Sequence, residues 1–170
     1  VTFPFFRQPE LTPKDNTFPL FKRMVKPGFD NLFFLGLAQP LPTLVNFAEQ
    51  STGGVDILIN NAGLGSSKRL IEMEDDEWNR VIDVTLNGTM RMMRAMLRRM
   101  LPRKSGVIVN NASVLGWRAQ PEQCHYAAAK AGVMALTRCA ALEAADFGVR
   151  INAVSPSIAL HEFLKKTTPM

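Results

Sequence analysis

Short apolar runs alternate with long helical stretches from residue 51 onward, and this alternation restricts the fold more than any other feature. The apolar runs predict buried strands at 55–59, 107–110 and 149–155. Between them, apolar side chains at three- and four-residue steps predict helices over 74–101 and 124–147. The order β-α-β-α-β is typical of a parallel sheet with right-handed crossovers and helices on its faces. We therefore expect an α/β fold of the Rossmann type with three layers.

Three segments follow the predicted strand ends, where parallel sheets bind their ligands. They are residues 60–63 (Asn-Asn-Ala-Gly), 111–113 (Asn-Ala-Ser) and 156–158 (Pro-Ser-Ile). All three fall on the same edge of the predicted sheet. Gly63-Leu64-Gly65 resembles the start of a dinucleotide fingerprint, but Lys68 stands at the third glycine position and no clear helix opens there. We reject that fingerprint.

Tyr126, the only tyrosine, and Lys130 lie at positions i and i+4 of a predicted helix and so share one face. A free phenol has a pKa near 10, too high for ready proton exchange at neutral pH, and a nearby ammonium lowers it. A hydroxyl such as that of Ser113 could hold a carbonyl oxygen while Tyr126 moves the proton. A bare Tyr-x-x-x-Lys is common by chance, with a half-buried aromatic ring and a solvated charge. Only the surrounding motifs decide between these interpretations.

The composition sets further limits. The chain has 170 residues, 46% of them hydrophobic, no apolar run of membrane-spanning length, and no signal-peptide pattern at its start. Cys124 and Cys139 would lie about 22 Å apart on one helix, too far for a disulfide, and we expect them to be buried, reduced and free of metal in a cytoplasmic protein. The net charge of +5 comes largely from arginines that close the helix over 74–101, where the helix dipole favours cations. We expect no nucleic-acid or membrane partner, although an anionic substrate remains open.

Five segments occur in the order and at the spacing of one known family: GGVDILINNAG (53–63), DEWNRVIDVTLNGT (76–89), GVIVNNASVLG (106–116), YAAAKAGVMALTRCAALE (126–143) and GVRINAVSPS (148–157). Residues 53–160 thus resemble the middle of a short-chain dehydrogenase/reductase. The resemblance implies an oxidoreductase that transfers hydride between NAD or NADP and a carbonyl/hydroxyl substrate. Actinobacterial members that act on CoA-linked or steroid-derived substrates are the most similar. A homo-oligomer formed through the helices 74–101 and 124–147 is also implied.

The resemblance implies roles for individual residues. Ser113 would polarise the substrate carbonyl, Tyr126 would be the general acid or base, and Lys130 would lower the tyrosine pKa and bind the nicotinamide ribose. Asn61, Ala62 and Gly63 would line the adenine-side ribose, and Pro156 and Ile158 would border the nicotinamide. The cofactor-binding residues implied are therefore Asn61, Ala62, Gly63, Tyr126, Lys130, Pro156 and Ile158.

The chain also departs from the family pattern. The glycine-rich T-G-x-x-x-G-x-G turn is absent, so we expect a partial fold that lacks the N-terminal β-α-β phosphate-binding unit. Thr85 stands where the family often has a catalytic asparagine, and Asn87, two positions on, would face another way. Residues 3–50 are rich in proline and phenylalanine and resemble the C-terminal part of a flavin-containing monooxygenase. We therefore expect two units, 1–50 and 51–170, in a chimeric chain.

Three functions stay open. The first is a short-chain dehydrogenase/reductase, the second a flavin-dependent monooxygenase fragment without a flavin fingerprint, and the third a catalytically inactive, truncated or chimeric remnant. An exposed sheet edge would favour association of such a remnant, unless the apolar run 31–37 pairs with the sheet in place of a missing strand. The substrate, the reaction direction and the choice between NAD and NADP stay open too.

Overall fold

A computed structural model describes residues 32–34, 45–46, 48–50 and 53–157. Most of the predicted unit 1–50, including the bulk of the monooxygenase-like segment, lies outside the described residues. Ile158, predicted to border the nicotinamide, lies outside them as well.

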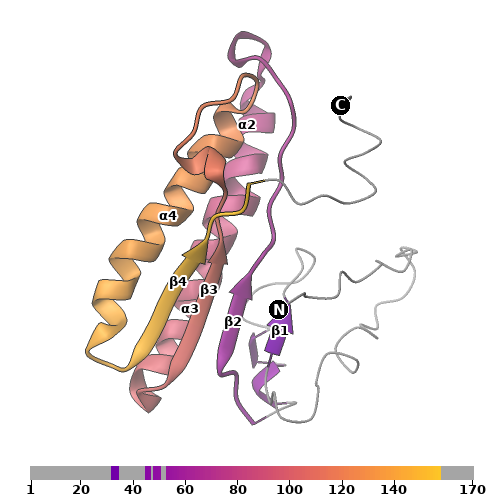
Figure 1. The fold of residues 1–170 in the computed structure, drawn as a ribbon. Helices are drawn as coiled ribbons and strands as arrows, with labels where there is room; N and C mark the ends of the chain where they lie inside the picture. Colours follow the sequence, from indigo (N-terminus) through magenta and orange to yellow (C-terminus); the bar gives the residue numbers. More distant parts are fainter. Residues whose placement is uncertain (1–31, 35–44, 47, 51–52, 158–170) are drawn as a thin grey trace.

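Four parallel strands form one sheet in chain order, as Figure 1 shows. They are β1 (Leu32–Phe34), β2 (Ile57–Asn60), β3 (Gly106–Asn111) and β4 (Val149–Val154). The predicted parallel α/β sheet is confirmed, with strand bounds that shift by up to two residues. In β1, Leu32 pairs with Ile57 of β2, so part of the apolar run 31–37 does join the sheet.

The helix predicted over 74–101 consists of three consecutive pieces. They are α2 (Asp75–Ile82), the π-helical turn η3 (Asp83–Asn87) and α3 (Gly88–Arg103), preceded by a short 3-10 turn, η2 (Leu70–Glu72). The Thr89 hydroxyl donates to the Thr85 carbonyl at 2.8 Å within the widened turn. Such side-chain insertion into the helical ladder is a known cause of local widening. The second predicted helix is α4 (Cys124–Ala145), and the 3-10 turn η4 (Val114–Gly116) joins it to β3.

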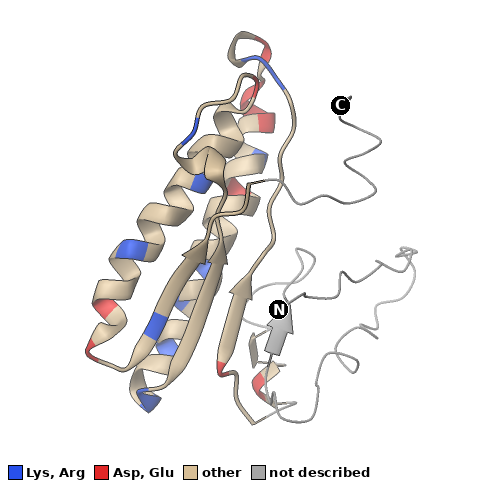
Figure 2. Ribbon diagram, viewed as in Figure 1, with Lys and Arg blue, Asp and Glu red and all other residues tan. Residues whose placement is uncertain are grey.

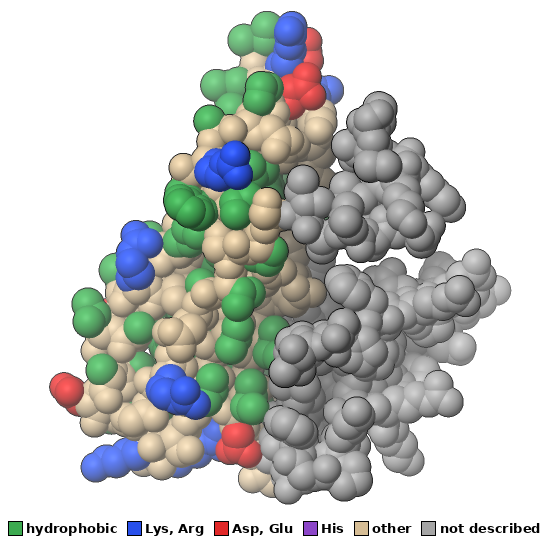
Figure 3. All heavy atoms as spheres, viewed as in Figure 1, with side chains coloured by type: hydrophobic (Ala, Val, Ile, Leu, Met, Phe, Trp, Pro, Cys, Tyr) green, Lys and Arg blue, Asp and Glu red, His purple; other side chains and the backbone are tan. Residues whose placement is uncertain are grey.

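The helices cover one face of the sheet, and the core lies between the two layers (Figure 1). Alternate strand residues point into it, such as Leu58 and Ile108, both fully buried. Methionines of α3 fill the opposite side, Met96 and Met100 among them. Figure 3 shows hydrophobic side chains along the other sheet face. The described residues thus supply two of the three predicted layers.

Charged side chains follow the helix dipole, as Figure 2 shows. Asp75, Asp76 and Glu77 open α2, and Arg103 and Lys104 close α3. Among the described residues, no helix combines the length and the apolar character that crossing a bilayer requires.

The expectation of buried cysteines is wrong. Cys124 and Cys139 are both free and both exposed. The buried residues of α4 recur at three- and four-residue steps, such as Ala129, Val133 and Ala140, and neither cysteine belongs to that stripe. The excluded disulfide is indeed absent.

Candidate active site

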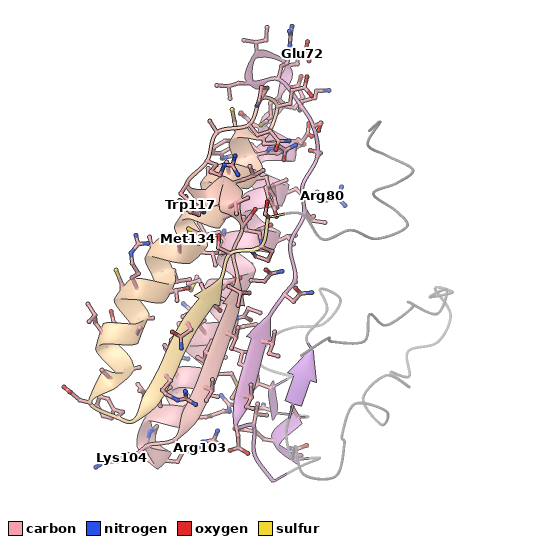
Figure 4. The ribbon with its side chains drawn as sticks, in the orientation of Figure 1. Glu72, Arg80, Arg103, Lys104, Trp117 and Met134 are labelled. Carbon is pink, nitrogen blue, oxygen red and sulfur yellow. The ribbon has the colours of Figure 1, made fainter. Side chains whose placement is uncertain are left out.

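The described residues of the three segments predicted to share one sheet edge are 60–63, 111–113 and 156–157. They do lie together at the carboxyl ends of β2, β3 and β4 (Figure 1). Backbone hydrogen bonds join the chain at the end of β3 to the chain at the end of β4: Ala112 N–H donates to Val154 O at 2.8 Å, and Val114 N–H donates to Pro156 O at 3.0 Å. Figure 4 shows Arg103 and Lys104 at the opposite end of the sheet. The basic end of α3 is therefore remote from the candidate site.

Lys130 lies on α4 and is buried, with 3% of its surface exposed. Its Nζ donates a hydrogen bond of 2.5 Å to the Asn111 carbonyl and lies 5.6 Å from the centroid of the Tyr126 ring. Burial lowers the pKa of Lys130 from its ordinary 10.5 to about 8, because the charged ammonium loses its hydration. The alternative in which Lys130 is a solvated charge is therefore wrong. Tyr126 is half-buried beside it.

Ser113 lies at the end of β3 and is also buried. Its Oγ accepts a hydrogen bond of 3.2 Å from the Leu115 N–H and so caps η4. Gly116 closes this turn so near α4 that a Cβ there would lie 3.1 Å from the Lys130 carbonyl carbon and 2.9 Å from Met134 Sδ. Figure 4 shows Trp117, at the end of the turn, beside Met134 of α4. The Ser113 turn thus rests on the part of α4 that carries Lys130.

The two glycines of the rejected fingerprint lie against the same pair of side chains. A Cβ at Gly63 would lie 3.4 Å from Lys130 Nζ, and one at Gly65 would lie 3.1 Å from Cδ2 of Tyr126. The described backbone forms no helix between them and η2 at Leu70, which agrees with the rejection. Glycine serves here to let the backbone approach two side chains closely.

Thr85 holds this loop from the side of the π-helical turn. It is fully buried, and its Oγ1 accepts a hydrogen bond of 3.0 Å from the Leu64 N–H. Asn87 faces elsewhere, where its Nδ2 donates to Asp83 Oδ1 at 3.1 Å. The prediction that Asn87 would not take the place of Thr85 is confirmed.

Asn111 is a site residue to which the sequence assigned no role, although it follows a strand end two positions before Ser113. Its carbonyl accepts from Lys130, and its Nδ2 donates to Asn61 Oδ1 at 2.6 Å. Its own Oδ1 is buried and has no hydrogen-bond partner among the described residues. A buried, unpaired acceptor at this edge is suited to a donor from a ligand.

A buried polar chain lies beneath the site and had no signal in the sequence patterns. Asn60 Nδ2 donates to Asn110 Oδ1 at 2.8 Å, and Asn110 Nδ2 donates to Thr137 Oγ1 at 2.9 Å. Thr137 in turn donates to the Val133 carbonyl at 2.7 Å. The chain fixes the ends of β2 and β3 to α4, the helix that carries Tyr126 and Lys130.

The other predicted cofactor-binding residues that the structure describes lie directly after the strands. Asn61, Ala62 and Gly63 follow β2 directly, and Pro156 follows β4 with an exposed side chain. Within the described ranges, no three His, Cys, Asp or Glu side chains gather as metal ligands would.

The short chain dehydrogenase family matches residues 37–170. A (5R,7aS)-5-hydroxy-7a-methyl-1-oxo-2,3,5,6,7,7a-hexahydro-1H-indene-carboxyl-CoA reductase of Mycobacterium tuberculosis is 63% identical over 126 residues, which are 73% of this chain and 48% of that protein. The 3-oxoacyl-(acyl-carrier-protein) reductase FabG of Vibrio harveyi is 45% identical over 104 residues, 61% of this chain and 43% of that protein. The chain thus spans about half the length of the curated relatives it matches.

Solved structures agree with this assignment of the fold. A short chain dehydrogenase from Mycobacterium smegmatis is 59% identical with a TM-score of 0.68, over 71% of this chain and 50% of that one. ElxO with NADP bound is 35% identical with a TM-score of 0.71, over 74% of this chain and 51% of that one.

Proposed function

We propose a function from one premise: the chain belongs to the short-chain dehydrogenase family. The proposed function is an NAD(P)-dependent oxidoreductase that acts on a carbonyl/hydroxyl pair by a Ser-Tyr-Lys mechanism. The observation that supports it best is the buried Lys130 ammonium, held by the Asn111 carbonyl at 2.5 Å beside the Tyr126 ring. Burying a lysine is costly, and a structural role alone gives no reason to place one beside the only tyrosine of the chain.

In the proposed mechanism Tyr126 exchanges the proton of the substrate oxygen. The Lys130 ammonium favours the phenolate electrostatically, and the burial of Lys130 strengthens the interaction. Ser113 keeps its O–H available for the substrate carbonyl oxygen while its own Oγ accepts from Leu115. A bound nicotinamide would supply or accept the hydride.

The residues present fit the nicotinamide side of such a cofactor. Gly63 and Gly65 bring the loop backbone close to Lys130 and Tyr126, since an added Cβ would lie 3.4 Å from Lys130 Nζ and 3.1 Å from Tyr126 Cδ2. The unpaired Asn111 Oδ1 is an acceptor suited to a hydroxyl group. We propose that Lys130 and Tyr126 hold the ribose on this side, with Asn61, Ala62 and Gly63 toward the adenine side and Pro156 and Ile158 beside the nicotinamide. The sequence has no glycine-rich turn for the phosphates.

We propose a ring ketone or alcohol carried on CoA as the substrate class. The support is the name of the M. tuberculosis relative, a reductase of a substituted hexahydroindene-carboxyl-CoA, and its 63% identity. The FabG relatives are named as 3-oxoacyl-(acyl-carrier-protein) reductases. A 3-oxoacyl thioester is therefore the substrate against which the CoA-linked ring ketone should be compared.

Titration of the purified chain with NADH and NADPH, followed by cofactor fluorescence, tests the proposal. Saturable binding that Lys130→Ala weakens at least tenfold supports the nicotinamide-side site. Tyr126→Phe should lose turnover and weaken binding less than Lys130→Ala does, because it removes only the phenol oxygen. Arg138→Ala, which removes an exposed cation from the same helix, is the matched control. A folded chain that binds neither cofactor at millimolar concentration would instead be the inactive remnant.

Further proposals concern the whole chain. We propose that the chain divides into the units 1–50 and 51–170, and that residues 3–50 are related to flavin-containing monooxygenases. The match to the short chain dehydrogenase family begins at residue 37, inside the first unit. We also propose a cytoplasmic homo-oligomer formed through α2 to α3 and α4. Flavin absorbance of the purified chain and its size in solution are the corresponding measurements.

A further inference from the structure

Three polar side chains outside the proposed catalytic set meet beside Tyr126. Ser66 Oγ donates to Glu77 Oε1 at 2.5 Å and lies 2.8 Å from His125 Nε2. His125 is fully buried, whereas Ser66 is exposed on the loop after β2 and Glu77 lies half-exposed in the first turn of α2. One hydroxyl therefore connects a loop and two helices.

The proton positions in this chain follow from what each group can donate. A carboxylate only accepts, so the single O–H of Ser66 points to Glu77. Ser66 Oγ must then accept from His125, which assigns the proton of the imidazole to Nε2. His125 Nδ1 is buried and has no partner among the described residues.

This arrangement is unlike that of a serine hydrolase, although a serine and a histidine are in hydrogen-bond contact. A nucleophilic serine gives its proton to the histidine, and a carboxylate orients the other ring nitrogen. Here the serine proton goes to Glu77, and Nδ1 lacks a carboxylate partner in the described part of the chain. The contacts therefore hold a loop and do not activate Ser66.

The loop that they hold covers the Tyr126–Lys130 pair, and we call residues 63–68 the strap. Gly63 faces Lys130 Nζ and Gly65 faces the Tyr126 ring at the distances given above. The strap is tied to the start of α4 by three further contacts. Gln123 Nε2 donates to the Ser66 carbonyl at 3.0 Å and to Ser67 Oγ at 3.1 Å, and the Lys68 N–H donates to the Glu122 carbonyl at 3.0 Å. Ser66 directly follows Gly65, and Tyr126 directly follows His125. The Ser66–His125 contact therefore lies next to the Gly65–Tyr126 contact.

We propose that the chain His125–Ser66–Glu77 is a positioning device that holds the strap against Tyr126 and Lys130 and keeps water from that pair. His125 and Ser66 are positioning residues and not catalytic ones, because they act through Gly63 and Gly65. The catalytic consequence rests on the proposed function, but the positioning itself does not require activity.

Ser66→Ala tests the proposal, with Ser66→Thr as the rescue. The matched control is Ser105→Ala, which changes an exposed serine directly before β3, at the opposite end of the sheet. The readout is the titration of Lys130, followed by NMR of lysine labelled with ¹³C at Cε and assigned with Lys130→Met. Because burial is what lowers the pKa of Lys130, a loosened strap should raise its titration midpoint from about 8 by one pH unit or more in Ser66→Ala. Ser105→Ala and Ser66→Thr should match the wild type, and a general loss of stability would not move the midpoint.

An unchanged Lys130 midpoint in folded Ser66→Ala overturns the proposal. If Ser66→Ala does not fold, Glu77→Ala against its neighbour Asp76→Ala gives the same comparison, since both acids lie in the first turn of α2. NADPH titration of the same samples separates the two claims. If the midpoint shifts in Ser66→Ala but the wild type binds no NADPH, the strap is supported and the proposed function is refuted. If the wild type binds NADPH but the midpoint does not shift in Ser66→Ala, the proposed function is supported and the strap is refuted.

Discussion

Replacing Lys130 by methionine should stabilise the chain in a way that depends on pH. The folded-state pKa of Lys130 is lowered from 10.5 to about 8, so the folded chain binds fewer protons than the unfolded chain between these values. The free energy of unfolding therefore rises with pH through this window. Well below pH 8 the buried ammonium costs the full difference, 10.5 − 8 = 2.5 pH units, or about 3 kcal/mol.

The cost falls as the pH rises. From the same two pKa values it is about 3 kcal/mol at pH 7 and about 1 kcal/mol at pH 9.5. Methionine also removes the hydrogen bond to the Asn111 carbonyl, a loss of about 1–3 kcal/mol that is largely independent of pH. The gain of Lys130→Met over the wild type should thus shrink by about 2 kcal/mol between pH 7 and pH 9.5.

Urea unfolding at four pH values, followed by the fluorescence of Trp78 and Trp117, measures this difference. Arg138→Met is the control, because an exposed arginine does not titrate in this range. A gain for Lys130→Met that stays constant within about 0.5 kcal/mol across the window would refute the reasoning, since it would mean that Lys130 keeps its hydration in the folded chain.

Three further predictions follow from the site. Gly65→Ala should cost about 1 kcal/mol in urea unfolding, because its Cβ would lie 3.1 Å from the Tyr126 ring; an unaffected midpoint would mean that the strap moves freely. Asn110→Leu should lower the free energy of unfolding by about 2 kcal/mol, because it leaves buried partners such as Thr137 without a hydrogen bond; equal stability would show that the buried chain adds nothing. NADPH affinity should fall at least threefold between pH 7 and pH 9.5 as the Lys130 ammonium deprotonates above about 8, and fluorescence titration that finds constant affinity would contradict a role for the ammonium.

The regular elements could be predicted because their signals are local. Strand β3 is a short apolar run after a glycine, and α4 ends close to Gly148, which adopts a left-handed φ of 69°. The contact of Gly148 with the end of α3, where an added Cβ would lie 3.0 Å from the Lys104 carbonyl, has no such signal, because it joins residues far apart in the chain.

The burial of Lys130 also could not be read from the sequence. A lysine in a helix predicts a solvated charge, and this one is covered by a carbonyl from β3 and a glycine from the loop after β2. The role of Thr85 in the π-helical turn is similar, since its hydroxyl accepts a hydrogen bond from a loop residue 21 positions away. In both cases the deciding contact is tertiary, and only the resemblance to a family indicated that these positions matter.

The sheet has a consequence for how the chain acquires its structure. Its strand pairs join residues far apart: 57 − 32 = 25 from Leu32 to Ile57, 107 − 57 = 50 from Ile57 to Val107, and 149 − 106 = 43 from Gly106 to Val149. Such non-local pairing makes folding slow, because loop closure must precede each ladder. During synthesis β3 emerges 43 residues before its partner β4. In that interval α3 can form and cover the apolar face of β3, while the edge of β3 that pairs with β4 stays unpaired.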